Sequence, residues 1–240
     1  MSTVLSARAW ETVWTYRATF VQGLLNTLET AGIALVIALI IGFTLGLFST
    51  SGHKALKAVA RVYVEFFQNT PLILQVCFLY YVLAYSGMGL PVIVVGFISL
   101  GLYHGAYISE VVRSGIEAVP AGQFDAAHSQ GFEYFGMMRY IILPQAFHNI
   151  VPTLLSQMIT TIKDSSYMAS LATIELMARV KLIISKANKY NGTWLGPMNR
   201  GTIHVSDVFV LFGLAFLTYF IINFSLSLVV RRLKKKRKPA

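Results

Sequence analysis

Four long stretches without a charged side chain limit what this chain can fold into more than any other feature. They cover residues 30–53, 66–109, 140–162 and 208–230, and hold 24, 44, 23 and 23 residues. A helix needs about 20 consecutive apolar residues to cross a bilayer, so each stretch is long enough. Burying them in a soluble protein would require a polar surface, yet only 12% of the 240 residues are charged. The sequence therefore predicts an all-α integral membrane protein.

The 44-residue stretch is too long for one crossing, and SGMGLP at 86–91 divides it, because glycine and proline favour a turn there. We therefore expect five transmembrane helices in a single domain, 1–240. The predicted spans are roughly residues 24–48, 62–85, 90–113, 141–163 and 208–230. The remaining parts are a loop at 119–140, an external or re-entrant segment at 164–207 and a basic tail at 231–240.

Basic residues predict the orientation. The tail RRLKKKRKPA carries seven Lys and Arg directly after the last span, and such clusters stay in the cytoplasm. Because five spans place the termini on opposite sides, we expect the N-terminus outside and the loop 119–140 in the cytoplasm. This arrangement puts twelve basic residues inside and eight outside. The tail also suits contact with anionic lipid headgroups.

The cytoplasmic loop contains a short helix bounded by turn-forming residues. Pro120 and Gly122 end the third span, and Gly131 suits a left-handed cap. Between them we expect about two helical turns from Gln123 to Ser129, with Asp125 in the first turn. A second helix, 133–143, returns to the membrane at Pro144. Ala126 and Ala127 are predicted to form one small-residue face that another protein's backbone approaches closely.

The same loop resembles a known family. It contains Asp125-Ala126-Ala127, then Gly131 after three residues, Ile141 after nine more and Leu143-Pro144 after one more. This pattern matches the cytoplasmic loop of ABC importer permeases, although the usual first residue there is Glu. Four further stretches resemble the polar amino acid uptake branch, the histidine/glutamate/glutamine/arginine permeases. They are FFQNTPLILQ (66–75), GAYISEVVRSGIEAVPAGQ (105–123), LPQAF (143–147) and TIKDSSYMASLATIEL (161–176). The residues 185–207 are the least similar part.

The resemblance implies the type I importer permease fold in a bacterial cytoplasmic membrane. It also implies four kinds of partner: a pair of ATPase subunits, a second permease chain (identical or homologous), an external amino acid-binding protein and a polar amino acid substrate. The short helix, with Gly122, Asp125, Ala126, Ala127 and Gly131, would dock on the ATPase. This chain would carry no cofactor, since ATP and Mg²⁺ would lie on the partner. No nucleic acid is expected.

Lys163-Asp164-Ser165-Ser166, at the outer end of the fourth span, is the candidate substrate site. Neighbouring residues on a helix point about 100° apart, so Lys163 and Asp164 need separate partners. An amino acid offers both signs: Asp164 would bind its ammonium group, and the Ser165 hydroxyl with free backbone N–H groups would bind its carboxylate. In similar permeases this segment lines the substrate path. The alternative is an interfacial charge pair that only shapes the fold.

Two other groups are candidates for the path. Pro71 interrupts the second span, and such breaks often mark transporter sites, so Thr70, Pro71 and Gln75 are predicted to border the path; a purely structural kink is the alternative. Glu110 and Arg113 lie three residues apart on a helix, which predicts an ion pair near a cytoplasmic gate.

The chain lacks several signatures of catalysis. It contains no G-x-x-x-x-G-K-[ST] phosphate loop, so ATP hydrolysis is assigned to a partner and the chain is not itself an enzyme. His104 and His148 have no carboxylate or cysteine at metal-ligand spacing, so no metal site is expected. The competing function is a stand-alone ion-coupled carrier or channel. Which amino acid is carried stays open.

Overall fold

The computed structural model describes residues 7–171, 175–190 and 205–235, and these residues form helices joined by short turns, with no strand among them. The segment 191–204, within the predicted external segment, and the end of the tail at 236–240 lie outside the described residues. The long elements are α1 (Ala7–Thr50), α2 (Lys54–Gln68), α3 (Leu72–Tyr85), α4 (Val92–Glu117), α7 (Leu143–Asp164), α8 (Leu176–Tyr190) and α9 (Val205–Lys235). The short ones are α5 (Ala121–Ser129), α6 (Tyr134–Met137), the π-helical turn η1 (Met138–Ile142) and the 3₁₀ helix η2 (Ser165–Leu171).

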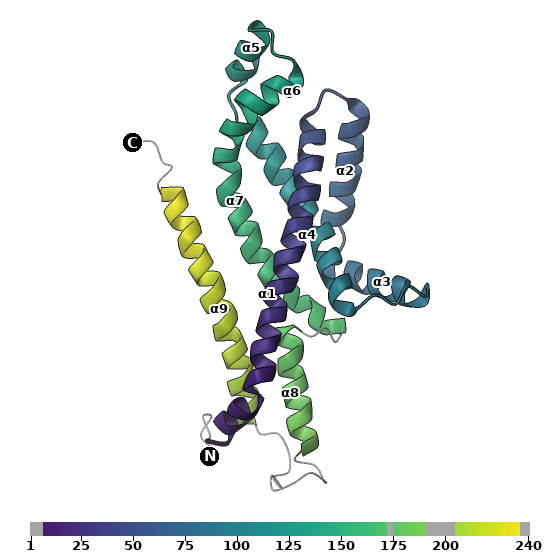
Figure 1. Cartoon of the computed structure of the whole chain (residues 1–240), viewed down its shortest axis with the longest axis vertical. Helices are drawn as coiled ribbons and strands as arrows, with labels where there is room; N and C mark the ends of the chain where they lie inside the picture. The colour runs from purple at the N-terminus through teal and green to yellow at the C-terminus, as the bar shows by residue number, and fades with distance from the viewer. Residues whose placement is uncertain (1–6, 172–174, 191–204, 236–240) are drawn as a thin grey trace.

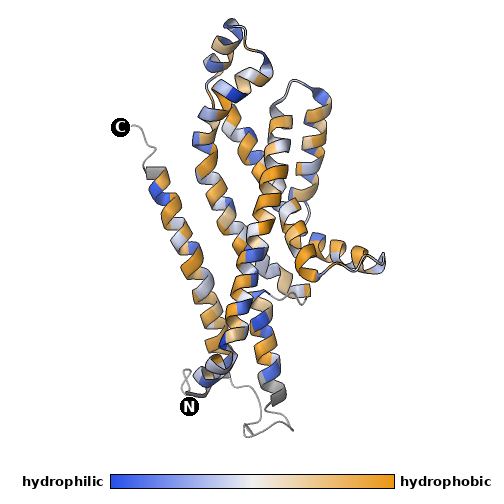
Figure 2. Ribbon diagram, viewed as in Figure 1, coloured by the Kyte–Doolittle hydropathy of each residue, from blue (hydrophilic) through white to orange (hydrophobic). Residues whose placement is uncertain are grey.

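Three described helices are long and apolar enough to cross a membrane: Ala9–Thr50 in α1, Val92–Glu117 in α4 and Ser206–Leu233 in α9. At 1.5 Å per residue, the 44 residues of α1 span about 66 Å, roughly twice a hydrocarbon core. The helix therefore extends well beyond any bilayer, and it begins far before the predicted span at 24–48. Figure 2 shows the apolar residues along the long helices, while hydrophilic residues gather at α5 and at the end of α9.

The predicted span at 62–85 is divided. α2 and α3 meet at an angle of 100°, so they form either a broken crossing or a re-entrant loop. Figure 1 shows α2 running beside α1 and α3 projecting sideways from the bundle. The bend falls at Asn69-Thr70-Pro71, because proline has no N–H to continue the helical ladder and disfavours a helical conformation of the residue before it.

Glycines bring α1 and α4 into close contact. A Cβ atom at Gly46 would lie 2.6 Å from Val112 Cβ, and one at Gly101 would lie 2.6 Å from Ile37 Cγ2. No real Cβ approaches another carbon so closely, so each glycine is needed for the neighbouring β-branched side chain to fit. Small residues at helix contacts are how membrane helices pack without a hydrophobic driving force. This interlock packs α4 closely against α1, and α4 carries Glu110 and Arg113 of the candidate site.

The loop after α4 is packed onto the same frame. One buried cluster contains Ile116 of α4, Val119 just after α4, Ala127 of α5 and Ile150 of α7. The expected second helix at 133–143 is not separate, since α6, η1 and α7 follow one another without a gap from Tyr134 to Asp164. Pro144 has no N–H to donate, and the N–H of Leu143 just before it bonds Met138 O, five residues back, which produces the π turn.

At the opposite end of the bundle a second core joins α1, α8 and α9, with Leu176, Val180 and Leu211 at its centre. Glu175 immediately precedes α8 there and is 2% exposed. Its Oε2 accepts a hydrogen bond from the Met177 N–H at 2.8 Å, and its Oε1 accepts one from the Ala178 N–H at 2.7 Å. Tyr219 Oη of α9 donates to Oε2 at 3.2 Å. The carboxylate thus caps α8 and ties it to α9.

The Glu175 carboxyl predicts a pH dependence. Burial raises its pKa above the ordinary value, although the hydrogen bonds from Met177, Ala178 and Tyr219 oppose this shift. Because the folded-state pKa is raised, the stabilisation from protonating Glu175 is complete below its unfolded pKa of about 4.3 and is lost as the pH rises through the folded pKa. Melting of wild type and Glu175→Gln in detergent at about pH 4, below the unfolded pKa, and at about pH 8 measures this effect. The melting temperature of the wild type should fall relative to the variant as the pH rises; a constant difference would contradict the assignment.

Candidate functional site

The short helix α5 stands at one tip of the molecule, between the ends of α4 and α6 (Figure 1). Pro120 precedes it, and Gly131 ends it with a φ of +79°, a conformation that favours glycine. Gly131 N donates to His128 O at 2.9 Å, and Phe132 N donates to Ala127 O at 3.1 Å, which closes the last turn. The predicted helix and its glycine cap are therefore confirmed. The helix begins at Ala121, two residues earlier than predicted, so Asp125 lies beyond the first turn.

The predicted small-residue face of α5 is wrong, because its two alanines point in different directions. Ala126 is exposed, whereas Ala127 is 1% exposed and packs in the inner core. Adjacent helical residues are about 100° apart, and Phe124 and Phe132 hold the Ala127 side inwards. Gly122, Asp125 and Ala126 remain available to a partner, and Ala127 anchors the helix.

The Lys163–Ser166 segment lies where α7 ends and η2 begins. Asp164 is the last residue of α7, with its side chain 20% exposed, and Lys163 is exposed. Ser165 is fully buried and its hydroxyl donates to Ile162 O at 2.8 Å, so the predicted contact of this hydroxyl with a substrate carboxylate is not available in this structure. Ser166 is partly exposed and donates to Lys163 O at 2.7 Å. Both bonds are typical of a helix end, where serine hydroxyls commonly donate to backbone carbonyls three residues earlier.

His104 of α4 lies behind Asp164. Its ring is 1% exposed, and Nε2 lies 3.4 Å from Asp164 Oδ2. Neither ring nitrogen has a hydrogen bond among the described residues. A buried polar group without a partner costs about 1–3 kcal/mol, and Asp164 is the carboxylate within ion-pair distance of this ring. His104 thus lies next to Asp164, the candidate residue for binding the substrate ammonium group.

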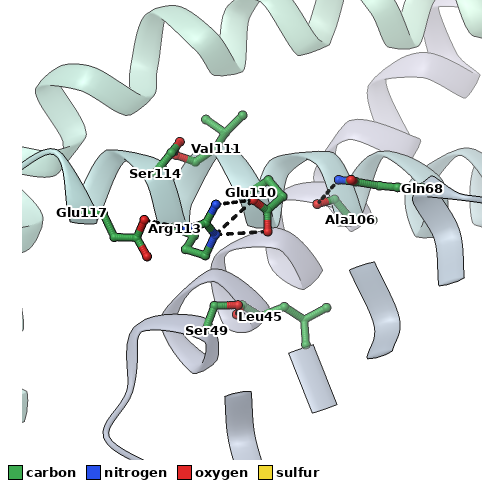
Figure 3. Close-up of polar contacts among 9 residues, drawn as sticks. All are labelled: Leu45, Ser49, Gln68, Ala106, Glu110, Val111, Arg113, Ser114 and Glu117. Atoms are coloured by element: carbon green, nitrogen blue, oxygen red, sulfur yellow. Dashed lines mark hydrogen bonds and ion pairs between the residues drawn. The ribbon is translucent and has the colours of Figure 1, made fainter. Parts of the chain in front are cut away.

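Arg113 is held between two carboxylates on α4 (Figure 3). Its Nη2 lies 2.7 Å from Glu110 Oε2, and its Nη1 lies 2.6 Å from Glu117 Oε2. The predicted Glu110–Arg113 ion pair is confirmed, and Glu117 extends it by one turn. The side chains of Arg113 and Glu110 are about one third exposed, at 35% and 36%, and both line a cavity that also reaches α2. The role of this pair as a gate stays a prediction.

A polar strip along α4 runs from the region beside Asp164 to the Glu110–Arg113 ion pair. Its members are spaced four, three, four and three residues apart, which places them on one face of a helix. They are Tyr103, Tyr107, Glu110, Ser114 and Glu117, and all are partly or fully exposed. The Tyr103 and Tyr107 hydroxyls lie 3.0 Å apart. Most of the rest of α4 is buried against α1, α7 and α2. Tyr103 and Tyr107 were not predicted as site residues, although their helical spacing from Glu110 is visible in the sequence.

Most of the polar side chains at the break between α2 and α3 form hydrogen bonds within the break itself. Thr70 Oγ1 donates to Phe66 O at 2.8 Å, and Asn69 Nδ2 donates to Glu65 O at 2.7 Å. Gln75 Nε2 lies 2.6 Å from Thr70 Oγ1 and 3.0 Å from Phe67 O. These bonds satisfy carbonyls that the break frees, which supports the structural reading of the kink. Thr70 and Gln75 also line an apolar cavity. The position of Thr70, Pro71 and Gln75 beside the substrate path stays a prediction.

The comparisons with known proteins agree with this geometry. Residues 38–239 match the family described as "Binding-protein-dependent transport system inner membrane component". The putative glutamine transport system permease protein GlnP of Rickettsia felis is 37% identical over 171 residues, covering 71% of this chain and 78% of that protein. The probable glutamine ABC transporter permease protein GlnP of Bacillus subtilis is 31% identical over 216 residues, covering 90% and 92%.

Solved structures show the same arrangement of helices. A chain from the crystal structure of an amino acid ABC transporter with histidines superposes with a TM-score of 0.75 at 30% identity, covering 92% of this chain and 96% of that one. A chain of the MetNI methionine ABC transporter in an inward-facing conformation gives a TM-score of 0.67 at 18% identity and supports the fold alone. The shared fold extends over nearly the whole chain.

Proposed function

Because this chain belongs to the family of binding-protein-dependent transport system inner membrane components, we propose that it is the permease subunit of an ATP-driven importer of polar amino acids. The names of its relatives, glutamine permeases, support an amino acid substrate of the glutamine class. ATP hydrolysis belongs to a separate pair of subunits, which hold ATP and Mg²⁺. A second permease chain and an external binding protein complete the assembly; GlnP and GlnM of Bacillus subtilis, at 31% identity each, are two such permeases in one organism.

The proposed topology has five crossings, formed by α1, the α2–α3 pair, α4, α7 and α9. Of these, α7 is less apolar than the three helices that meet the criterion for a membrane span. Its polar residues are accommodated if it faces α4 and a second permease instead of lipid. Figure 1 shows the end of α9 towards the same side of the molecule as α5, and the start of α1 at the opposite side. The basic end of α9 therefore supports a cytoplasmic position for α5.

We assign coupling to α5, which is exposed at the tip and anchored from below by Ala127. Gly122, Asp125 and Ala126 face a groove of the ATPase subunit, and Gly131 stops the helix so that the chain can turn back towards α7. Movement of the ATPase pair pushes α5, and its anchor in the inner core transmits this push to α4 and α7. The permease then changes between inward- and outward-facing states.

The single observation that carries the transport path is the polar strip of α4. A charged side chain facing lipid costs roughly 2.5–3.5 kcal/mol, so a strip containing Glu110 and Glu117 faces water or protein. In our proposal the substrate ammonium group meets Asp164 at the outer end, passes the Tyr103 and Tyr107 hydroxyls, and leaves near Glu110 and Arg113. Thr70, Pro71 and Gln75 border the path at the α2–α3 bend. Lys163 and Ser166 lie at its mouth, and Ser165 holds the turn.

Reconstitution tests the function. Proteoliposomes with the permease, its ATPase subunits and the binding protein should take up labelled glutamine, glutamate, histidine or arginine only when ATP reaches the ATPase, and vanadate should stop the uptake. The matched control omits the ATPase subunits and applies a sodium or proton gradient. Uptake by the permease alone under such a gradient would instead support the stand-alone carrier.

A further inference from the structure

The amphipathic helix α2 carries a polar face that the path described above does not use. Lys54, Lys57, Arg61, Glu65 and Gln68 follow one another at steps of three, four, four and three residues, so they share one side of the helix. The opposite side is apolar and open, with Val59 57%, Val62 68% and Phe66 58% exposed. The apolar side suits lipid or protein, whereas the charged side requires water or ionic partners.

The polar face of α2 reaches α4 through Gln68, while the side chains of Arg61 and Glu65 remain 79% and 59% exposed. Gln68 Nε2 donates to Ala106 O of α4 at 3.4 Å (Figure 3). Between the two helices lies a cavity of about 440 Å³, within the range of small-molecule sites, and its polar lining is Ser49, Lys57, Arg61, Glu65, Glu110 and Arg113. Ser49 is one residue from the end of α1, and Arg113 is one turn from the end of α4, so the cavity lies towards the end of α4 that leads to α5.

The charges in this cavity are unevenly matched. Arg113 is neutralised by Glu110 and Glu117, and Arg61 Nε lies 2.7 Å from Glu65 Oε1. Lys57, one turn from Arg61, has no carboxylate within ion-pair distance in the described part of the chain. The cavity lining therefore contains three cations and two carboxylates, while Glu117 pairs with Arg113 from outside the lining. Among the described residues, the Lys57 ammonium group is the cation of this lining without a carboxylate partner. The two carboxylates, on α2 and α4, offer acceptors for a cation on the same ligand.

We propose that this cavity is a second amino acid subsite, at the α5 end of the path and separate from Asp164. Lys57 and Arg61 bind the α-carboxylate, and Glu65 or Glu110 accepts hydrogen bonds from the α-ammonium group. Both signs are present within a few turns, and this arrangement suits a zwitterion better than a simple anion. The inference rests on the proposed function. It adds that the transported amino acid pauses on the inner side and that an accumulated internal pool occupies the subsite and slows further uptake.

The test compares inhibition of uptake by internal substrate. Proteoliposomes containing the complete transporter are preloaded with increasing unlabelled glutamine, glutamate, histidine or arginine, and ATP-driven uptake of the same labelled amino acid is measured. Lys57→Gln should raise the inhibiting internal concentration about tenfold, because a charged hydrogen bond is lost, and Lys57→Arg should restore most of it. Lys54→Gln is the matched control, since Lys54 loses the same charge on the same face but does not line the cavity.

Three outcomes overturn the subsite. The first is an unchanged inhibiting concentration in Lys57→Gln, and the second is an equal change in Lys54→Gln. The third is an effect of Lys57→Gln that appears in vesicles with phosphatidylglycerol but not in vesicles of phosphatidylcholine alone, because it would assign Lys57 to a lipid phosphate. Failure of the proposed function is distinguishable, since then the wild-type complex would take up none of the four amino acids.

Discussion

Replacing Asp164 with asparagine should reduce ATP-driven amino acid uptake by about 10- to 100-fold, with most of the loss in the apparent affinity for substrate. Asp164 is partly exposed at the end of α7, and a hydrogen bond between charged groups contributes roughly 1.5–3 kcal/mol, which corresponds to this range. Asparagine keeps the size and an acceptor oxygen but removes the charge. Initial uptake rates over a range of binding-protein-delivered substrate concentrations measure the effect.

Two companion variants separate binding from structure. Asp164→Glu keeps the charge and should retain more uptake than the asparagine variant. His104→Gln removes the ring beside Asp164 and should produce a smaller loss, because its Nε2 lies at 3.4 Å, longer than a strong hydrogen bond. Melting in detergent should be similar for Asp164→Asn and wild type. If Asp164→Asn transports normally, or if it fails only because the protein melts early, Asp164 shapes the fold and does not bind substrate.

Local rules predicted those parts of the fold that depend on neighbouring residues. Pro71 placed the bend, and the sequence between Pro120 and Gly131 placed α5, because proline and glycine act on their own backbone. The Glu110–Arg113 pair followed from helical spacing alone. These features need no knowledge of distant packing.

The failures concern side chains whose surroundings come from other helices. Ala127 is buried in the cluster that includes Ile150 and has Phe132 packed against it, and nothing in the motif separates Ala127 from Ala126. Ser165 is buried by the turn between α7 and η2. The polar strip of α4 had a readable spacing, but Tyr103 and Tyr107 became candidates only when the structure showed that their face is open. The types of group present can be identified in the sequence, whereas the packing of the helices decides which of them are accessible.

Replacing Ala126 and Ala127 one at a time with tryptophan should separate coupling from folding. Ala126 is exposed, so Ala126→Trp should leave the permease folded in the membrane, with a melting temperature close to that of the wild type. A bulky ring at the centre of the proposed docking face should displace the ATPase subunit and lower uptake about 100-fold, because central contacts of an interface are each worth up to several kcal/mol. Co-purification of the ATPase and uptake in proteoliposomes measure this.

Ala127→Trp should behave differently. Ala127 is 1% exposed in a packed core, and overpacking costs typically 1–3 kcal/mol or more, so this variant should melt earlier whether or not the ATPase is present. Ala126→Ser is the control for the exposed position, since its small side chain should preserve both co-purification and uptake. Because α5 is anchored through Ala127 and presented through Ala126, the two positions should lose function by different routes. Normal co-purification and uptake in Ala126→Trp would place the ATPase contact elsewhere and remove α5 from the coupling mechanism.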